Sequence, residues 1–159
     1  MTTFTPPATI AFIGLGMMGR PMAKRLVEAG FTLRVFDVSQ KAVSDFVGAH
    51  PSALATASAK AAAQGAAALI TMLPDGKIVR QAVLEGQDPA IEGLEAGAVV
   101  MEMSSSNPVD TQKLAKDLAG RGELGHQVEA ADDQHDQRAE RAQRRRAEPG
   151  VGEVGHGER

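Results

Sequence analysis

The 159-residue sequence contains no cysteine. Disulfide bonds, catalysis by a thiolate and metal sites built on cysteine are therefore excluded for these residues. A chain without cysteine suits a reducing compartment, so we expect a cytoplasmic protein. No stretch approaches the roughly 18 consecutive apolar residues of a membrane span. The apolar run Ile10–Met18 is interrupted by glycines and has no basic residue before it, unlike a secretory signal, and we expect no contact with a membrane.

An excess of charge is also lacking, because 17 Lys and Arg stand against 20 Asp and Glu, for a net charge of -3. A net charge this small does not indicate a strongly charged binding partner. The length leaves room for one ordinary domain with one hydrophobic core. We expect that core in the first part of the chain, because every Ile, Met and Phe precedes Gly122.

Apolar residues are scarce in residues 123–159, which we call the tail. The tail contains six Arg and nine Asp or Glu, but only one Leu and three Val. Burial of so little apolar surface does not offset the entropy lost on ordering, which favours disorder or a solvated helix at about Glu129–Glu148. We therefore predict a folded domain over residues 1–122 and a charged tail over residues 123–159.

Short apolar runs alternate with helical patterns along residues 1–122. Strands are predicted at Thr9–Ile13, Thr32–Phe36, Ala53–Ala55, Ala67–Met72 and Ala98–Met103. Helices are predicted from about Met18 to Gly30, Ser39 to Val47, Ser58 to Gln64, Gly76 to Leu84 and Asn107 to Gly122. Strands separated by helices indicate a parallel sheet covered on both faces. The predicted fold class is α/β, a doubly wound parallel sheet of the Rossmann type.

Gly14, Gly16 and Gly19 form the pattern G-x-G-x-x-G between the first predicted strand and helix, with Leu15, Met17 and Met18 as the intervening residues. Glycines at this spacing serve a tight turn, the close approach of backbone to a pyrophosphate, and the packing of helix on strand. The phosphates would lie at the helix N-terminus, where unpaired N–H groups and the positive end of the dipole favour anions. The pattern predicts a dinucleotide site, although an ordinary glycine turn is the alternative.

Asp37 strengthens the dinucleotide interpretation, because it lies 23 residues after Gly14 and ends the second predicted strand. An acid at this place accepts hydrogen bonds from the adenosine ribose hydroxyls. It would also repel a 2′-phosphate. The sequence therefore favours NAD as the cofactor over NADP.

Three segments in order resemble the β-hydroxyacid dehydrogenases, the family that includes 3-hydroxyisobutyrate dehydrogenase. They are GLGMMGRPMAKRL from Gly14, TMLP at Thr71–Pro74 and EMSSSNP at Glu102–Pro108. The resemblance covers about Ile10–Gly122. It implies an NAD-binding domain of an oxidoreductase that acts on a small 3-hydroxy acid.

The resemblance also assigns further cofactor residues. It implies that Leu73 and Pro74, after the fourth strand, contact the cofactor, and that Ser105, after the fifth, lies near the nicotinamide ribose. Both loops leave the carboxyl ends of strands, where open α/β sheets bind ligands. Taken without the resemblance, Leu73 reads as a core residue and Ser104–Ser106 as a turn with capping hydroxyls.

The segments that complete a family member are not found after Gly122. The family continues with a sixth strand, a substrate loop, a catalytic lysine and a helical second domain, whereas the last lysine of this sequence is Lys116. We expect a strand edge exposed after the fifth strand, a truncated, catalytically incomplete chain with no assigned catalytic residue, and a tail unrelated to the family. A shift of reading frame would explain such a tail, and a hydroxy acid substrate is expected only in full-length relatives.

The tail offers weak alternatives. Asp132, Asp133, His135 and Asp136 could be drawn as a metal site, but a flexible segment supplies no preorganised geometry, and we predict no metal. The arginines are outnumbered by acids and have no aromatic neighbour for stacking, so we predict no nucleic acid partner. The remaining alternative is a nonenzymatic nucleotide-binding or interaction module whose tail recruits a partner. The coding DNA would distinguish this module from a frameshift.

Overall fold

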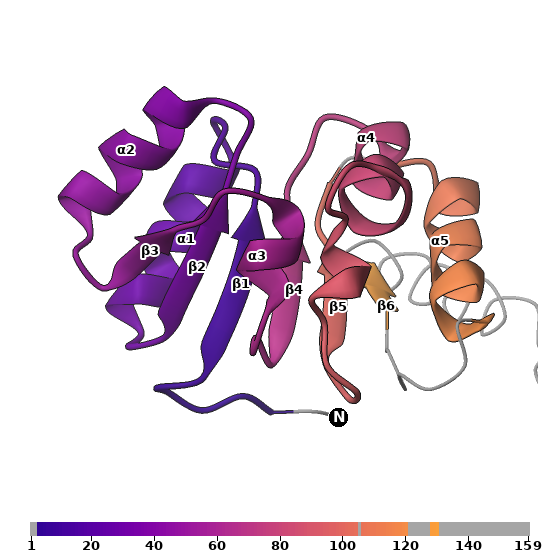
Figure 1. Ribbon diagram of the computed structural model, residues 1–159, viewed down its shortest axis with the longest axis horizontal. Coiled ribbons are helices and arrows are strands. Elements are labelled where there is room, and N and C mark those ends of the chain that lie inside the picture. The colour runs from indigo at the N-terminus through magenta and orange to yellow at the C-terminus, as the bar shows by residue number, and fades with distance from the viewer. Residues whose placement is uncertain (1–2, 105, 121–127, 131–159) are drawn as a thin grey trace, which may run out of the picture.

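The computed structural model describes residues 3–104, 106–120 and 128–130. In this part of the chain, six parallel strands form one sheet with the order β3-β2-β1-β4-β5-β6 (Figure 1). The strands are β1 (Thr9–Ile13), β2 (Thr32–Phe36), β3 (Ala53–Ala55), β4 (Ala68–Thr71), β5 (Val99–Glu102) and β6 (Val128–Ala130). From β1 the chain adds β2 and β3 on one side and then β4, β5 and β6 on the other. The neighbouring ends of β1 and β4 are therefore the topological switch point of the sheet.

Helices connect the strands and cover both faces of the sheet. They are α1 (Gly19–Glu28), α2 (Gln40–Ala49), α3 (Ala59–Ala63), α4 (Gly76–Arg80), the π-helical turn η1 (Gln81–Glu85), the 3₁₀ turn η2 (Ala90–Glu92) and α5 (Pro108–Gly120). Side chains of α1 and α2 share one core cluster, and those of α3, η1, η2 and α5 share the other. The predicted α/β, doubly wound class is therefore confirmed.

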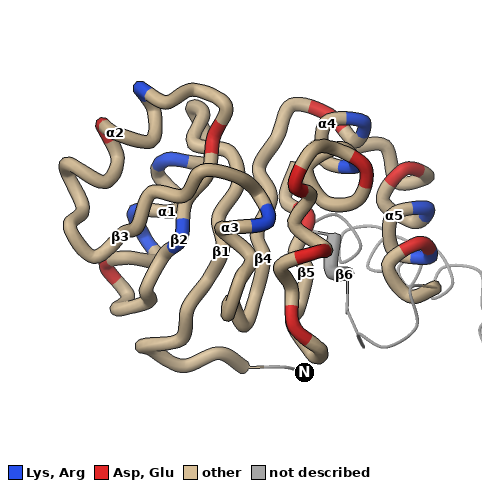
Figure 2. The backbone as a smooth tube through the Cα atoms, viewed as in Figure 1, with Lys and Arg blue, Asp and Glu red and all other residues tan. Residues whose placement is uncertain are grey.

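Strand β1 shows why the sheet is buried on both sides. Ile10 and Phe12 belong to the core under α1 and α2, whereas Ala11 and Ile13 belong to the opposite core. Alternate residues of a strand point to opposite faces, so a continuous apolar run suits only a sheet with two covered faces. Neither β1 nor β4 carries a charged residue (Figure 2).

Side-chain caps begin the helices α2, α3 and α4. The Ser39 hydroxyl accepts a hydrogen bond from the Ala42 N–H at 3.2 Å, and the Ser58 hydroxyl accepts one from the Ala61 N–H at 3.1 Å. Asp75 accepts one from the Ile78 N–H at 2.8 Å. Each cap satisfies a backbone donor that has no partner inside the helix, and so fixes where the helix starts after its strand.

Some helical details differ from the expectations. The fourth predicted helix continues to Glu85, but its second half is the π-helical η1, and η2 was not predicted. Met18 precedes α1 and is exposed, whereas Gly19 and Ala23 are the buried residues of that helix. Gly30 ends α1 as expected, with a φ of 91°. No helix among the described residues is long and apolar enough to cross a membrane.

Strand β6 corrects the expectation that no strand follows Gly122 and that the edge of β5 is exposed. Val128–Ala130 pair in parallel with β5, with Val100 opposite Val128. The same residues exclude a helix beginning at Glu129, while 131–148 lie outside the described residues. The backbone groups at the edge of β5 can pair with any short extended segment. Such pairing does not require a strand-like composition in the added segment, so composition alone did not indicate β6.

Candidate functional site

The glycine turn joins β1 to α1 at the switch point of the sheet. Gly14 has a φ of +101°, and a Cβ atom there would lie 2.2 Å from the Met72 carbonyl oxygen. A Cβ at Gly19 would lie 1.9 Å from the Gly14 carbonyl oxygen. Both positions therefore require glycine for reasons internal to the fold: the turn itself, its contact with the loop after β4, and the packing of α1 against β1.

Gly16 differs from the other two glycines. A Cβ atom at Gly16 would meet no protein atom within 4 Å, and its φ lies outside the left-handed region. Neither the backbone conformation nor packing among the described residues thus requires a glycine here. The open space over Gly16 is the space that a ligand in contact with the backbone would need.

Backbone donors face this open space at the start of α1. Gly14 N–H donates to the Phe36 carbonyl at 3.0 Å, and Leu15 N–H donates to Asp37 Oδ2 at 2.7 Å. The N–H groups of Gly16, Met17 and Met18 have no acceptor among the described residues. All three residues are exposed, and no side chain caps the helix. Three unpaired donors at the positive end of a helix dipole are an arrangement that favours an anion.

Asp37 follows β2 and lies beside the glycine turn. Its Oδ2 accepts the Leu15 N–H and its Oδ1 accepts the Ser39 N–H, both at 2.7 Å. The sequence predicted only a role toward a ribose, whereas the structure shows that this carboxylate also holds the turn and the start of α2. Each oxygen retains a lone pair for a further donor, and the side chain is half-buried.

The loops after β4 and β5 join the same edge of the sheet. Leu73 is half-buried against the core and its N–H donates to Ser104 Oγ at 2.8 Å, while Pro74 is exposed. The close approach of Met72 to Gly14 brings the loop after β4 against the glycine turn. Ser105, the third residue assigned by the resemblance, lies outside the described residues.

Exposed apolar side chains surround this edge. Among the described residues, the exposed large hydrophobic side chains are Met17, Met18, Val38, Leu54, Ile78 and Val109. All except Leu54 belong to the loops that follow β1 and β2 or to the first turns of α4 and α5. An apolar rim around unpaired polar donors is typical of a ligand site.

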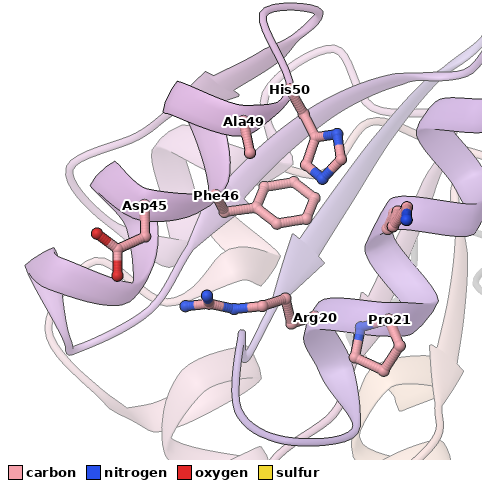
Figure 3. Close-up of a pocket in the computed structure, with 7 residues that line it drawn as sticks. Arg20, Pro21, Asp45, Phe46, Ala49 and His50 are labelled. Atoms are coloured by element: carbon pink, nitrogen blue, oxygen red, sulfur yellow. The ribbon is translucent and has the colours of Figure 1, made fainter.

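A groove of about 270 Å³ lies between α1 and α2 (Figure 3). Phe46 and Pro21 contribute to its apolar lining, and Arg20 extends toward Asp45 across it (Figure 3). Lys41 Nζ donates to Asp45 at 2.8 Å, and this hydrogen bond lowers the pKa of the Asp45 carboxyl. The groove contains none of the predicted cofactor residues.

No group of three His, Asp or Glu that could hold a metal ion occurs among the described residues. The candidate ligands rejected above, Asp132, Asp133, His135 and Asp136, lie outside that part of the chain.

The chain matches one family over most of its length. Residues 9–143 match the sequence model described as the NAD binding domain of 6-phosphogluconate dehydrogenase. The chain belongs to this family of NAD-binding domains. The match includes β6 and runs beyond Gly122 into the tail, so the division at Gly122 remains a prediction.

Individual relatives agree with this assignment. The chain is 47% identical over 117 residues to 3-sulfolactaldehyde reductase of Escherichia coli strain K12, covering 72% of this chain and 38% of that protein. It is 42% identical over 113 residues to the NAD-dependent L-serine dehydrogenase of Pseudomonas aeruginosa, covering 71% and 37%. The chain thus spans less than half the length of the curated relatives it matches.

Solved structures show the same relationship. The structure of Mycobacterium tuberculosis 3-hydroxyisobutyrate dehydrogenase with L-serine superposes with a TM-score of 0.66 at 30% identity, covering 76% of this chain and 40% of that one. The resemblance to the 3-hydroxyisobutyrate dehydrogenase group, inferred from three short motifs, is confirmed.

Two residues at this edge of the sheet were not predicted to have a role there. Glu102 is buried at the end of β5, and Ser104 accepts the Leu73 N–H. Glu102 had a recognisable signal, because an acid within the run AVVMEM interrupts a strand that is otherwise apolar. Ser104 had none, because a turn of three serines does not indicate which hydroxyl the fold uses.

Proposed function

We propose that this chain binds NAD at the carboxyl ends of β1 and β4, as the cofactor-binding part of an oxidoreductase that acts on a small 3-hydroxy acid. The observation that carries the proposal is the open space over Gly16 together with the unpaired N–H groups of Gly16, Met17 and Met18. A pyrophosphate is an anion with several acceptor oxygens, and it matches donors grouped at a helix N-terminus.

The remaining site residues have separate roles in this proposal. Gly14, Leu15 and Gly19 shape the turn, and Asp37 accepts hydrogen bonds from the adenosine ribose. Val38, which follows Asp37 and is 91% exposed, offers no cation for a 2′-phosphate. We therefore infer a preference for NAD over NADP. In this proposal Leu73 and Pro74 contact the cofactor, and Ser105 is assigned near the nicotinamide ribose by the resemblance alone.

The substrate class follows from the relatives. L-serine and 3-hydroxyisobutyrate, named for two of them, are both small acids with a hydroxyl on carbon 3. NAD, when bound, supplies the hydride acceptor for oxidation of such an alcohol. The proton of the alcohol needs a positioned base, and none of the cofactor residues proposed here is assigned that role. A cytoplasmic location stays a prediction.

The purified 159-residue chain is expected to bind NAD with a dissociation constant on the order of 10⁻⁵ to 10⁻³ M, the range in which enzymes commonly bind cofactors and substrates. Calorimetric titration measures this constant. In an assay for NADH with L-serine or 3-hydroxyisobutyrate, the same 159 residues are expected to show no more than a trace rate, because none of the residues proposed near the nicotinamide is a base for the alcohol proton. If a folded sample does not bind NAD at millimolar concentration, the proposed binding site is wrong. If the sample binds NAD and turns over substrate steadily, only the expectation of no more than a trace rate is wrong.

A further inference from the structure

Glu102 lies at the carboxyl end of β5 and is only 3% exposed, so its side-chain carboxylate is buried. Thr71 is the other buried polar residue among the described ones, and it lies opposite Glu102 in the register of β4 and β5. No Lys, Arg or His of the described part forms an ion pair with Glu102. Removal of an unpaired carboxylate from water is costly unless hydrogen bonds replace the lost hydration.

Two hydrogen bonds to Glu102 replace that hydration and connect different elements. Oε1 accepts the Ser104 N–H at 2.7 Å, and Oε2 accepts the Thr111 hydroxyl at 3.0 Å. Ser104 Oγ in turn accepts the Leu73 N–H at 2.8 Å. A continuous path of hydrogen bonds therefore runs from α5, through the end of β5, to the loop after β4.

This path ends against the glycine turn. Leu73 follows Met72, whose N–H donates to the Ile13 carbonyl at 2.9 Å. A Cβ on Gly14 would lie only 2.2 Å from the Met72 carbonyl oxygen, so the loop after β4 packs directly against the backbone of the turn. A displacement of this loop would therefore be transmitted to the turn that precedes the unpaired donors.

We propose that Glu102 is a positioning residue for the cofactor site, which fixes the loop after β4 through the Ser104 hydroxyl. This inference rests on the proposed function. Glu102 is itself too deeply buried to touch a cofactor. Its contribution is geometric: it orients Ser104, Ser104 holds Leu73, and the glycine turn keeps the spacing that an anion requires.

The test compares the dissociation constant for NAD with the melting temperature in four variants. Ser104→Ala and Glu102→Ala are each expected to weaken NAD binding by about tenfold, because each breaks the path to Leu73. Glu102→Gln keeps an oxygen for the Ser104 N–H and an amide for the Thr111 hydroxyl, and should bind within about threefold of the native chain. Ser58→Ala is the matched control, since it also removes a hydroxyl that accepts a backbone N–H, but at the start of α3.

Ser58→Ala should lower the melting temperature about as much as Ser104→Ala while leaving NAD affinity unchanged. Native affinity in Ser104→Ala would overturn the proposal, and so would a Glu102→Gln variant as weak as Glu102→Ala. If Glu102→Ala does not fold, the Ser104→Ala and Glu102→Gln pair decides. A native chain that fails to bind NAD would instead contradict the proposed function.

Discussion

Substitution of Gly16 by alanine is expected to weaken NAD binding by roughly 30-fold, or about 2 kcal/mol, while leaving the fold intact. A methyl group forced into a fitted contact costs about 1–3 kcal/mol, and the backbone of Gly16 is where we place the pyrophosphate. The protein itself leaves that space open, so the methyl meets no protein atom within 4 Å. The thermal stability of Gly16→Ala should equal or slightly exceed that of the native chain. Titration with NAD and thermal melting measure the two effects.

Two other glycines make this experiment decisive. Gly48 lies in α2, and a Cβ there also meets nothing within 4 Å, so Gly48→Ala should stabilise the chain without changing NAD affinity. Gly19→Ala should destabilise the fold by about 3 kcal/mol, because its Cβ would clash with the Gly14 carbonyl. A Gly16→Ala variant with native affinity would show that the glycine serves something other than a bound pyrophosphate.

Substitution of Asp37 by asparagine is expected to lower the preference for NAD over NADP by at least tenfold. The carboxylate lies beside the glycine turn, where a 2′-phosphate would come within a few ångströms of its charge, and repulsion at such a distance near the surface is worth about 1–3 kcal/mol. Asparagine removes the charge and keeps one oxygen, so only one of the N–H groups of Leu15 and Ser39 retains its acceptor. We expect weaker NAD binding together with stronger NADP binding, measured by parallel titrations.

Salt provides an independent check of the Asp37 mechanism. If the preference has an electrostatic origin, raising the ionic strength should reduce it in the native chain and have little effect in Asp37→Asn. Asp45→Asn is the matched control, since Asp45 is an acid on α2 whose partner is Lys41. An unchanged cofactor ratio in Asp37→Asn would mean that Asp37 serves the turn alone.

Short-range patterns in the sequence predicted most of the strands and the starts of several helices. The apolar runs located β1 to β5, and the helical patterns that begin at about Ser39, Ser58 and Gly76 located α2, α3 and α4, because strands and helices of this kind have short-range patterns. Strand β6 was missed because its pairing depends on the free edge of β5 rather than on its own residues. The π-helical η1 was missed because it directly continues α4, and an apolar helical pattern does not specify which hydrogen bonds the helix forms.

The cofactor class could be predicted from the sequence, but the arrangement of residues at this edge of the sheet could not. The spacing of the glycines and the position of Asp37 named the cofactor class, because both follow from how a strand, a turn and a helix meet a pyrophosphate. The sequence did not show that Gly14 and Gly19 serve the fold while Gly16 faces open space. Nor did it show the path from Glu102 through Ser104 to Leu73, since residues on different strands become neighbours only in the sheet.

The most direct test of the central claim is a ¹⁵N-resolved NMR titration of the purified chain with NAD. The account predicts that the backbone amides of Gly16, Met17 and Met18 show the largest shifts, because their N–H groups would gain acceptor oxygens. Neighbouring changes should follow at Leu15 and Asp37. The account would be contradicted if a folded sample showed no shift at those amides, or if the shifts were confined to the groove between α1 and α2.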